Sequence, residues 1–144
     1  MQMFMGEYSH TIDAKGRLII PARFREELGD RFVVSKGFDG CLQANSLSTW
    51  ENIQEKLKEL PQFNKNTREI KRFFNGGAVI AEVDKQGRIL IPAELREHAG
   101  LKKNVSLIGT GSNVEIWDSE RWNESAPDNI DDIAESLSGL GFSL

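Results

Sequence analysis

The sequence is poor in the residues that carry most enzyme and metal chemistry. Its 144 residues include one cysteine, Cys41, and two histidines, His10 and His98, which lie far apart in the chain. One cysteine cannot form an internal disulfide, and no Cys/His cluster has the spacing of a zinc site. Neither Gly-x-x-x-x-Gly-Lys-Ser/Thr nor Gly-x-Gly-x-x-Gly occurs, so the common phosphate-binding loops are excluded. We therefore expect no enzyme, and no metal, cofactor or small-molecule ligand.

Long apolar runs are also missing. No stretch is long enough to span a bilayer. The first residues, MQMFMGEY, lack the basic region and apolar core of a signal peptide. Charged residues make up 28% of the chain and hydrophobic residues 39%, which is ordinary for a globular protein. We expect a cytoplasmic protein that does not enter a membrane.

The main positive feature is a stretch that occurs twice. Residues 13–26 are DAKGRLIIPARFRE and residues 84–97 are DKQGRILIPAELRE, and they are identical at 8 of 14 positions without a gap. An agreement of this kind indicates a duplicated module. The shared positions that define the motif are Asp13/Asp84, Gly16/Gly87, Arg17/Arg88 and Pro21/Pro92.

Each copy has the same order of structural signals. An alternating run precedes the Asp, which favours a strand, and the glycine tolerates the positive φ of a tight turn. An aliphatic run follows, and the proline then ends that strand and fits the start of a helix. Gly29 and Gly100 stand at the expected helix ends, after Leu28 and Ala99. β-like residues follow, so each half is predicted to be β-hairpin, short helix, β-hairpin.

Four short strands bury little apolar area alone, so the two halves should pack together. We predict a β-rich α+β fold in which two tandem repeats form a pseudo-twofold β-barrel, with helices between and after the repeats. The expected divisions are 7–49 for the first repeat, 50–77 for a helical connector, 78–121 for the second repeat and 122–144 for an acidic C-terminal tail. In the connector, Ser48 to Glu51 has the spacing of a capping box. In the tail, Ile130, Ile133 and Leu137 suggest a short amphipathic helix.

The net charge of −4 is unevenly distributed. From Glu115 onwards the chain has 8 acidic residues and 1 basic residue, whereas the part before it has 14 acidic and 17 basic residues. The body is therefore slightly basic, and this permits a local positive surface for a polyanion.

Asp13 and Asp84 are the only residues that suggest acid–base chemistry. Each precedes an arginine by four residues across a predicted turn. A structural Asp–Arg pair that holds the turn is the more economical interpretation.

The two Asp-x-x-Gly-Arg elements, each followed by apolar-apolar-Ile-Pro-Ala, resemble the MraZ family of the AbrB/SpoVT-like swapped-hairpin DNA-binding superfamily. The resemblance covers nearly the whole chain, from GEYSHTIDAKGRLIIPARFRE to EIWDSERW. It implies a cytoplasmic, nucleoid-associated transcriptional regulator that binds double-stranded DNA, and whose setting is the gene cluster for cell division and wall synthesis. It also implies a ring of several subunits on tandem short DNA repeats.

The family's DNA-contacting arginine corresponds to Arg17, and its counterpart in the second copy is Arg88. Lys15 matches the basic position in the first turn, where the second copy has Gln86, with Lys85 one residue earlier. Arg23 follows in the first half only, so the first half is the favoured base-reading half. An arginine can bridge guanine O6 and N7, whereas a lysine more often contacts phosphate.

Two other functions stay open at this stage. A non-catalytic oligomeric scaffold that binds a protein partner is the main alternative. An antitoxin-like module is the other, although such modules are usually a single half with a toxin-binding tail, and the duplication argues against it.

Overall fold

The computed structural model of the protein describes residues 3–142. The first two residues of the N-terminal stretch and the last two of the expected tail lie outside this range. The described strands are β1 (Glu7–Thr11), β2 (Arg17–Ile19), β3 (Arg31–Lys36), β4 (Leu42–Ser46), β5 (Val79–Glu82), β6 (Arg88–Leu90), β7 (Asn104–Gly109) and β8 (Val114–Asp118). The described helices are α1 (Ala22–Leu28), α2 (Leu47–Lys58), α3 (Lys65–Gly76), α4 (Ala93–Ala99), α5 (Ser119–Ser125) and α6 (Ile130–Ser136), with 3₁₀ turns η1 (Phe38–Gly40) and η2 (Leu137–Leu140).

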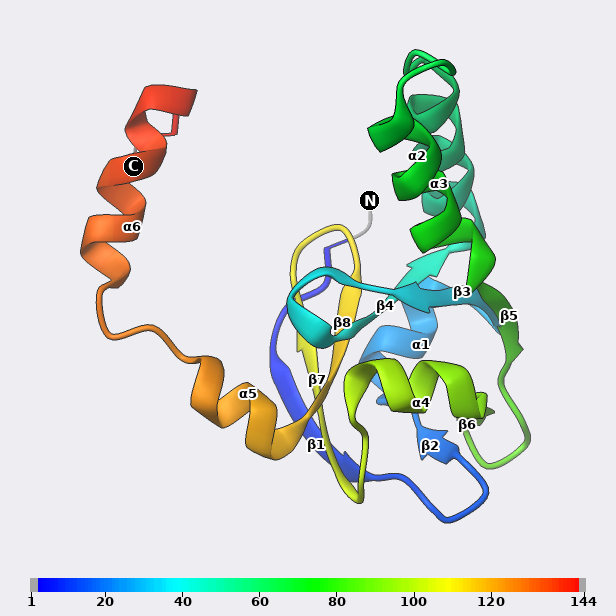
Figure 1. The fold of residues 1–144 in the computed structure, drawn as a ribbon. Coiled ribbons are helices and arrows are strands. Elements are labelled where there is room, and N and C mark those ends of the chain that lie inside the picture. The colour runs from blue at the N-terminus through cyan, green and yellow to red at the C-terminus, as the bar shows by residue number, and fades with distance from the viewer. Residues whose placement is uncertain (1–2, 143–144) are drawn as a thin grey trace.

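The strands form one six-stranded antiparallel sheet and one two-stranded ribbon (Figure 1). The sheet has the order β1-β7-β8-β4-β3-β5, and the ribbon pairs β2 with β6. If each strand is replaced by its counterpart in the other half, the same order is obtained when the sheet is read from its opposite edge. The topology is therefore pseudo-twofold. The α+β class is confirmed. A closed barrel is not formed by the described strands. Since β1 and β5 lie at opposite edges and each pairs with one neighbour only, the sheet stays open.

The hairpin that the residue pattern predicts at the start of each half does not form, because its strands pair with the other half, as the swapped-hairpin resemblance implies. β1 pairs with β7, β5 pairs with β3, and β2 pairs with β6. In the first half, an isolated β-bridge joins Ile12 and Leu18 across the turn, and the N–H of Asp13 donates to the carbonyl oxygen of Arg17 at 3.0 Å. The exchange buries the inward aliphatic residues next to both turns, among them Leu18 and Ile89, in a common core, which neither half could build alone. The later hairpins, β3–β4 and β7–β8, form within their halves as predicted.

The short helices have the predicted ends. Pro21 and Pro92 occupy the N-cap positions of α1 and α4. Gly29 follows α1 with φ 87°, and Gly100 follows α4 in the left-handed conformation with φ 61° and ψ 33°. Glycine takes such angles without the steric cost that a Cβ imposes.

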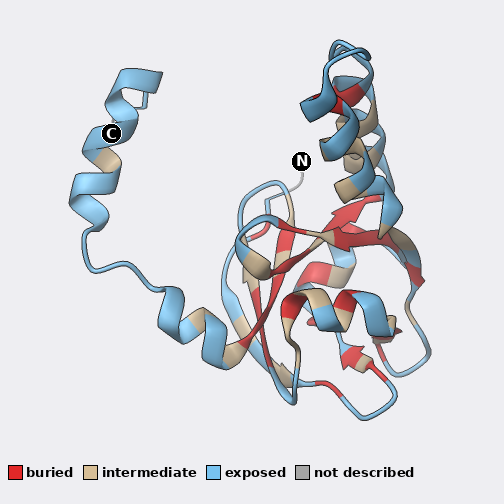
Figure 2. Ribbon diagram, in the orientation of Figure 1, coloured by how far each residue is buried: buried red, intermediate tan, exposed pale blue. Residues whose placement is uncertain are grey.

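One continuous apolar core joins the halves (Figure 2). It receives the inward residues of the ribbon, the buried face of α1 and α4, and the inner face of the sheet. Its fully buried large side chains include Phe4, Leu18, Phe24, Phe32, Leu42, Ile89, Ile91, Leu95, Leu107 and Ile116.

The connector forms a helical hairpin that stands beyond the sheet (Figure 1). Gln54 and Asn75 link α2 to α3 by a 2.7 Å side-chain hydrogen bond. The predicted capping box at Ser48 is wrong, and Ser46, two residues earlier, is the N-cap of α2. The Oγ of Ser46 accepts the backbone N–H of Thr49 at 3.2 Å, so α2 begins before Ser48.

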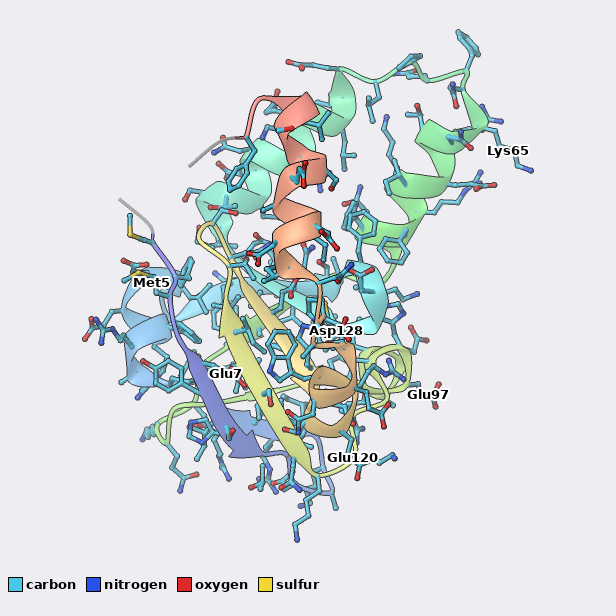
Figure 3. All side chains as sticks on the ribbon, turned by 90° about the vertical axis from the view of Figure 1, so that its left-hand side faces the viewer. Met5, Glu7, Lys65, Glu97, Glu120 and Asp128 are labelled. Carbon is cyan, nitrogen blue, oxygen red and sulfur yellow. The ribbon has the colours of Figure 1, made fainter. Side chains whose placement is uncertain are left out.

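The acidic C-terminal segment is helical over most of its described length. α5 lies against β7 and β8, and Figure 3 shows Glu7, Glu120 and Asp128 on that side of the molecule. The amphipathic helix predicted around Ile130 is confirmed as α6. It is largely exposed and stands away from the body, at the end opposite the ribbon (Figures 1 and 2). Within residues 3–142, no helix is long and apolar enough to cross a membrane.

Candidate nucleic-acid interface

Both copies of the repeated motif fold into the same turn. In the first turn, Oδ1 of Asp13 accepts the backbone N–H groups of Lys15 at 3.0 Å and Arg17 at 2.9 Å. Its Oδ2 accepts Nε of Arg17 at 2.9 Å. In the second turn, Asp84 makes the same three hydrogen bonds, to Gln86 N–H at 2.8 Å, Arg88 N–H at 2.9 Å and Arg88 Nε at 3.0 Å. Each carboxylate therefore shapes its turn and also orients the arginine that follows.

The carboxylates of these turns are poor candidates for acid–base catalysis. The backbone hydrogen bond from Arg17 is the main cause that lowers the pKa of Asp13 below its ordinary value of 3.8. The backbone hydrogen bond from Arg88 does the same to the pKa of Asp84. A general acid that works at neutral pH needs a raised pKa instead. Both groups are therefore fixed anions whose role is to hold the turns.

The ribbon has one face in the core and one face in solvent. Arg17 lies opposite Leu90, Leu18 opposite Ile89, and Ile19 opposite Arg88. The central pair is buried, with exposed fractions of 0% for Leu18 and 1% for Ile89. Because side chains alternate along a strand, the flanking pairs project outwards.

The outward face of the ribbon combines two arginines with two aliphatic side chains. Arg17 and Arg88 lie diagonally across it, one from each half. Ile19 and Leu90 complete it, with exposed fractions of 41% and 58%. This composition suits a DNA groove, since arginines can bind guanine edges and phosphates while apolar groups can contact the methyl group of thymine.

The ribbon is closed by reciprocal hydrogen bonds between the halves. The N–H of Ile20 donates to the carbonyl oxygen of Gly87 at 2.9 Å, and the N–H of Ile91 donates to that of Gly16 at 2.8 Å. Gly16 has φ 91°, and a Cβ built there would lie 2.6 Å from the carbonyl oxygen of Ile91. Each turn thus needs glycine for its backbone angle, and Gly16 needs it also for the close approach of the other half.

A hollow of about 410 Å³ lies beside the ribbon, and both halves line it. Its lining residues are Lys15, Arg17, Glu82, Asp84, Arg88, Ile89 and Leu90. The structure therefore brings together three of the sequence-predicted DNA-binding residues, one lysine and two arginines. Lys85 is exposed in the second turn, one residue before Gln86.

Arg23 lies apart from this group. It is on the exposed side of α1 and lines a different hollow, which includes Met3, Phe4 and Phe24. Its exposed position is compatible with a contact to the flanking backbone of a bound polyanion, but it does not belong to the ribbon face.

Sequence reasoning missed the outward-facing Ile19 and Leu90. The signal was present, because an aliphatic run of three residues in a strand must turn one residue away from the core. The sequence predicts this run as one strand without assigning a face to each residue, and in the structure the middle residue of Leu18 to Ile20 projects into solvent.

Cys41 has the environment of a structural thiol. Its side chain is fully buried, and its Sγ lies 3.1 Å from the carbonyl oxygen of Phe38. Burial raises the pKa of this thiol to about 12, with a further contribution from the nearby charge of Glu115. The nucleophilic thiolate is therefore not populated at neutral pH. In the part of the chain that the structure describes, no three His, Cys, Asp or Glu residues are grouped closely enough to hold a metal ion.

Comparison with known proteins assigns the chain to a family. The family model described as "MraZ protein, putative antitoxin-like" matches residues 3–73 and again residues 74–134. The chain belongs to the MraZ family. A relative named Transcriptional regulator MraZ from Lachnoclostridium phytofermentans is 52% identical over 142 residues, which cover 99% of this chain and 100% of the relative.

Two further MraZ relatives show the same full-length match. One from Caldanaerobacter subterraneus subsp. tengcongensis is 57% identical, and one from Acetivibrio thermocellus is 51% identical, each over 143 residues that cover 97% of this chain and 100% of the relative. Both are named Transcriptional regulator MraZ. The resemblance drawn from the two Asp-x-x-Gly-Arg elements is thus confirmed, and the two matches to one family model agree with a duplicated chain.

Proposed function

We propose that this chain is a sequence-specific DNA-binding transcriptional regulator that inserts the β2–β6 ribbon into the major groove. The observation that carries the proposal is the pair Arg17 and Arg88 on the outward face of an antiparallel two-stranded ribbon. A ribbon of this kind is narrow enough for the major groove of B-DNA, and several DNA-binding proteins use strands in this way. The names of the full-length relatives support the same class of function.

We assign a role to each of these residues, and their geometry supports the assignment. Arg17 donates Nε to Asp13, which leaves its terminal N–H groups for a bidentate contact with a guanine edge. Lys15, at the tip of the first turn, is placed to contact a phosphate as a point charge. Arg88 and Lys85 supply the corresponding contacts from the second half, and Arg23 a flanking phosphate contact. The first half is the main base-reading half, because its turn has Lys15 where the second has Gln86.

The charge distribution is compatible with this arrangement. The acidic helix α6 lies at the end of the molecule opposite the ribbon (Figure 1), so its carboxylates do not face a duplex bound there. A net charge of −4 therefore does not prevent local binding of a polyanion.

A chain with so few basic groups at its interface should bind one DNA box weakly. Several copies joined in a ring would bind tandem repeats of that box far more tightly, because each further contact becomes intramolecular. We therefore include a homo-oligomeric ring on tandem short repeats in the proposal. Its site of action is the protein's own promoter, in the gene cluster for cell division and wall synthesis, and its location is the nucleoid in the cytoplasm.

An oligomeric scaffold for a protein partner is the alternative, and exposed apolar groups favour it. Phe63, in the loop between α2 and α3, has an exposed fraction of 98%, and Phe38 is 54% exposed while stacked on Phe73. These groups lie away from the ribbon, so a protein contact there would not compete with DNA.

The test is a fluorescence anisotropy titration of the wild-type protein at one fixed salt concentration. It compares the DNA upstream of the protein's own gene with a scrambled fragment of equal length and composition. The proposal expects tighter binding of the upstream DNA by at least tenfold, as specific sites exceed non-specific ones by roughly a thousandfold or more. Equal affinity for both fragments would favour the scaffold.

A further inference from the structure

Arg25 and Arg96 occupy the same position in the two copies of the motif. Each covers the turn of the opposite half. Arg25 follows the first ribbon strand and lies on α1, yet its guanidinium packs on the second turn. A Cβ built on Gly87 would lie 2.9 Å from Nη1 and 3.0 Å from Cζ of Arg25. Arg96 on α4 packs on the first turn in the same way, since a Cβ on Gly16 would lie 3.0 Å from its Nε and 3.2 Å from its Cζ.

Each guanidinium packs against the glycine of the turn and forms no ion pair with it. The Nε atoms of Arg25 and Arg96 are buried and have no hydrogen-bond partner among the described residues. Each arginine as a whole is half-buried, so its Nε is shielded while the residue keeps some exposure to solvent. The Cβ built on each glycine would lie at similar distances from Cζ and from a nitrogen of the guanidinium. The flat group therefore lies over the turn. A Cβ at either glycine would press on this guanidinium, which would have to shift.

We propose that Arg25 and Arg96 are positioning residues that hold the DNA-reading turn of the opposite half. Arg25 fixes the turn that carries Arg88, and Arg96 fixes the turn that carries Arg17. This inference rests on the proposed function of the ribbon. A turn whose tip is clamped loses less conformational freedom when its arginine binds a base, so the clamp should raise sequence preference more than overall affinity.

The crossing of the halves makes the proposal specific. A residue that only stabilised its own half would act on the arginine close to it in sequence, so Arg25 would affect Arg17. The crossed contacts predict instead that Arg25 is coupled to Arg88, and that Arg96 is coupled to Arg17. The two pairs serve as internal controls for each other, because they have the same chemistry in the same chain.

The experiment measures the ratio of affinities for upstream and scrambled DNA in double-mutant cycles. Arg25→Lys and Arg96→Lys keep the charge but remove the planar group, so they isolate positioning from electrostatics. Each is combined with Arg17→Ala and with Arg88→Ala. Arg72→Ala on the exposed side of α3 controls for the loss of a distant charge, and light scattering checks that every variant keeps the wild-type assembly.

We expect Arg25→Lys to reduce the preference for upstream DNA by roughly three- to tenfold in the wild-type and Arg17→Ala backgrounds, and to have no further effect in the Arg88→Ala background. Arg96→Lys should show the reverse pattern. Coupling of Arg25 to Arg17 alone, or equally to both arginines, would overturn the crossed assignment. Lysine variants that bind as the wild type does would show that charge alone matters, which also overturns it.

A DNA-free measurement separates this proposal from the function on which it rests. In hydrogen exchange of the intact protein, Arg25→Lys should speed exchange over residues 84–88 and leave residues 13–17 unchanged, and Arg96→Lys should do the opposite. Unchanged exchange at both turns would contradict the clamp even if DNA binding were established. Crossed exchange effects in a protein without DNA preference would keep the clamp and remove its role in reading DNA.

Discussion

The Nε of Arg17 donates a 2.9 Å hydrogen bond to Oδ2 of Asp13, while Oδ1 of the same carboxylate accepts the backbone N–H of Arg17. One aspartate thus holds both the backbone and the side chain of the arginine. Asp84 repeats the arrangement with Arg88. Neither carboxylate is deeply buried, so these ion pairs add little to overall stability. Their main effect is to orient two arginines that face solvent.

Removal of Lys15 should weaken binding without changing sequence preference. A phosphate contact carries no information about the base sequence. Lys15→Ala should therefore lower the affinity for upstream DNA and for scrambled DNA by the same factor. The slope of log affinity against log salt should fall by about 1 in magnitude, as one counterion fewer is released. Titrations over a series of salt concentrations measure this slope, with Arg72→Ala as the control that leaves it unchanged. A loss confined to the upstream DNA would instead assign Lys15 to base reading.

The two aspartates should contribute to the stability of the protein in a pH-dependent way. Both have a pKa lowered from 3.8 by hydrogen bonds of the turn. The folded state therefore binds protons less readily than the unfolded state, and the stability contributed by these groups is present above pH 3.8 and is lost as pH falls through their lowered values. The variant Asp13→Asn/Asp84→Asn should melt below the wild type at neutral pH, and the difference should shrink as the solution is acidified below 3.8. Thermal unfolding monitored by circular dichroism gives the comparison, and a constant difference at all pH values would speak against the assignment.

Alanine at the turn glycine should destabilise the protein more than alanine at another glycine with a similar backbone angle. Gly16 has φ 91° and Gly111 has φ 93°, but a Cβ on Gly111 would meet no atom within 4 Å. Gly111→Ala should therefore show the cost of the angle alone, about 1–2 kcal/mol. Gly16→Ala adds a 2.6 Å approach to the carbonyl oxygen of Ile91 and should cost more. Urea unfolding of both variants tests this, and equal costs would mean that the exchanged turn relaxes freely.

Cys41 should be inert in the folded protein. Burial raises the pKa of its thiol to about 12, and the side chain is not exposed to solvent. Iodoacetamide at neutral pH should therefore leave the native protein unmodified and alkylate it fully in denaturant, as mass spectrometry would show. Rapid alkylation of the native protein would mean that the region around η1 opens readily.

Local features of the fold could be predicted from the sequence because local residues determine them. The ends of α1 and α4 follow from Pro21, Pro92 and the glycines that come after each helix. The cap of α2 was misplaced by two residues, since Ser46 and Ser48 offer the same chemistry and only tertiary packing decides between them.

The pairing of the strands could not be predicted from the residues alone. The alternation of apolar residues sets which face of a strand is buried, but it does not say which strand is the neighbour. The hairpin expected within each half is therefore replaced by exchange between the halves. The contact of Arg25 with Gly87 depends on that exchange, which is why the repeated arginines were seen in the sequence while their partners were not.

The most direct test of the central claim, that the exchanged ribbon reads DNA sequence, is an anisotropy titration of Arg17→Ala beside the wild type. Upstream and scrambled DNA are compared at one stated salt concentration, and light scattering confirms the same assembly for both proteins. We predict that the wild type prefers the upstream DNA and that Arg17→Ala loses about 1–3 kcal/mol of this preference for each recognised guanine, while it keeps most of its affinity for scrambled DNA. An undiminished preference in Arg17→Ala, with the assembly intact, would contradict the claim and place base recognition outside the ribbon.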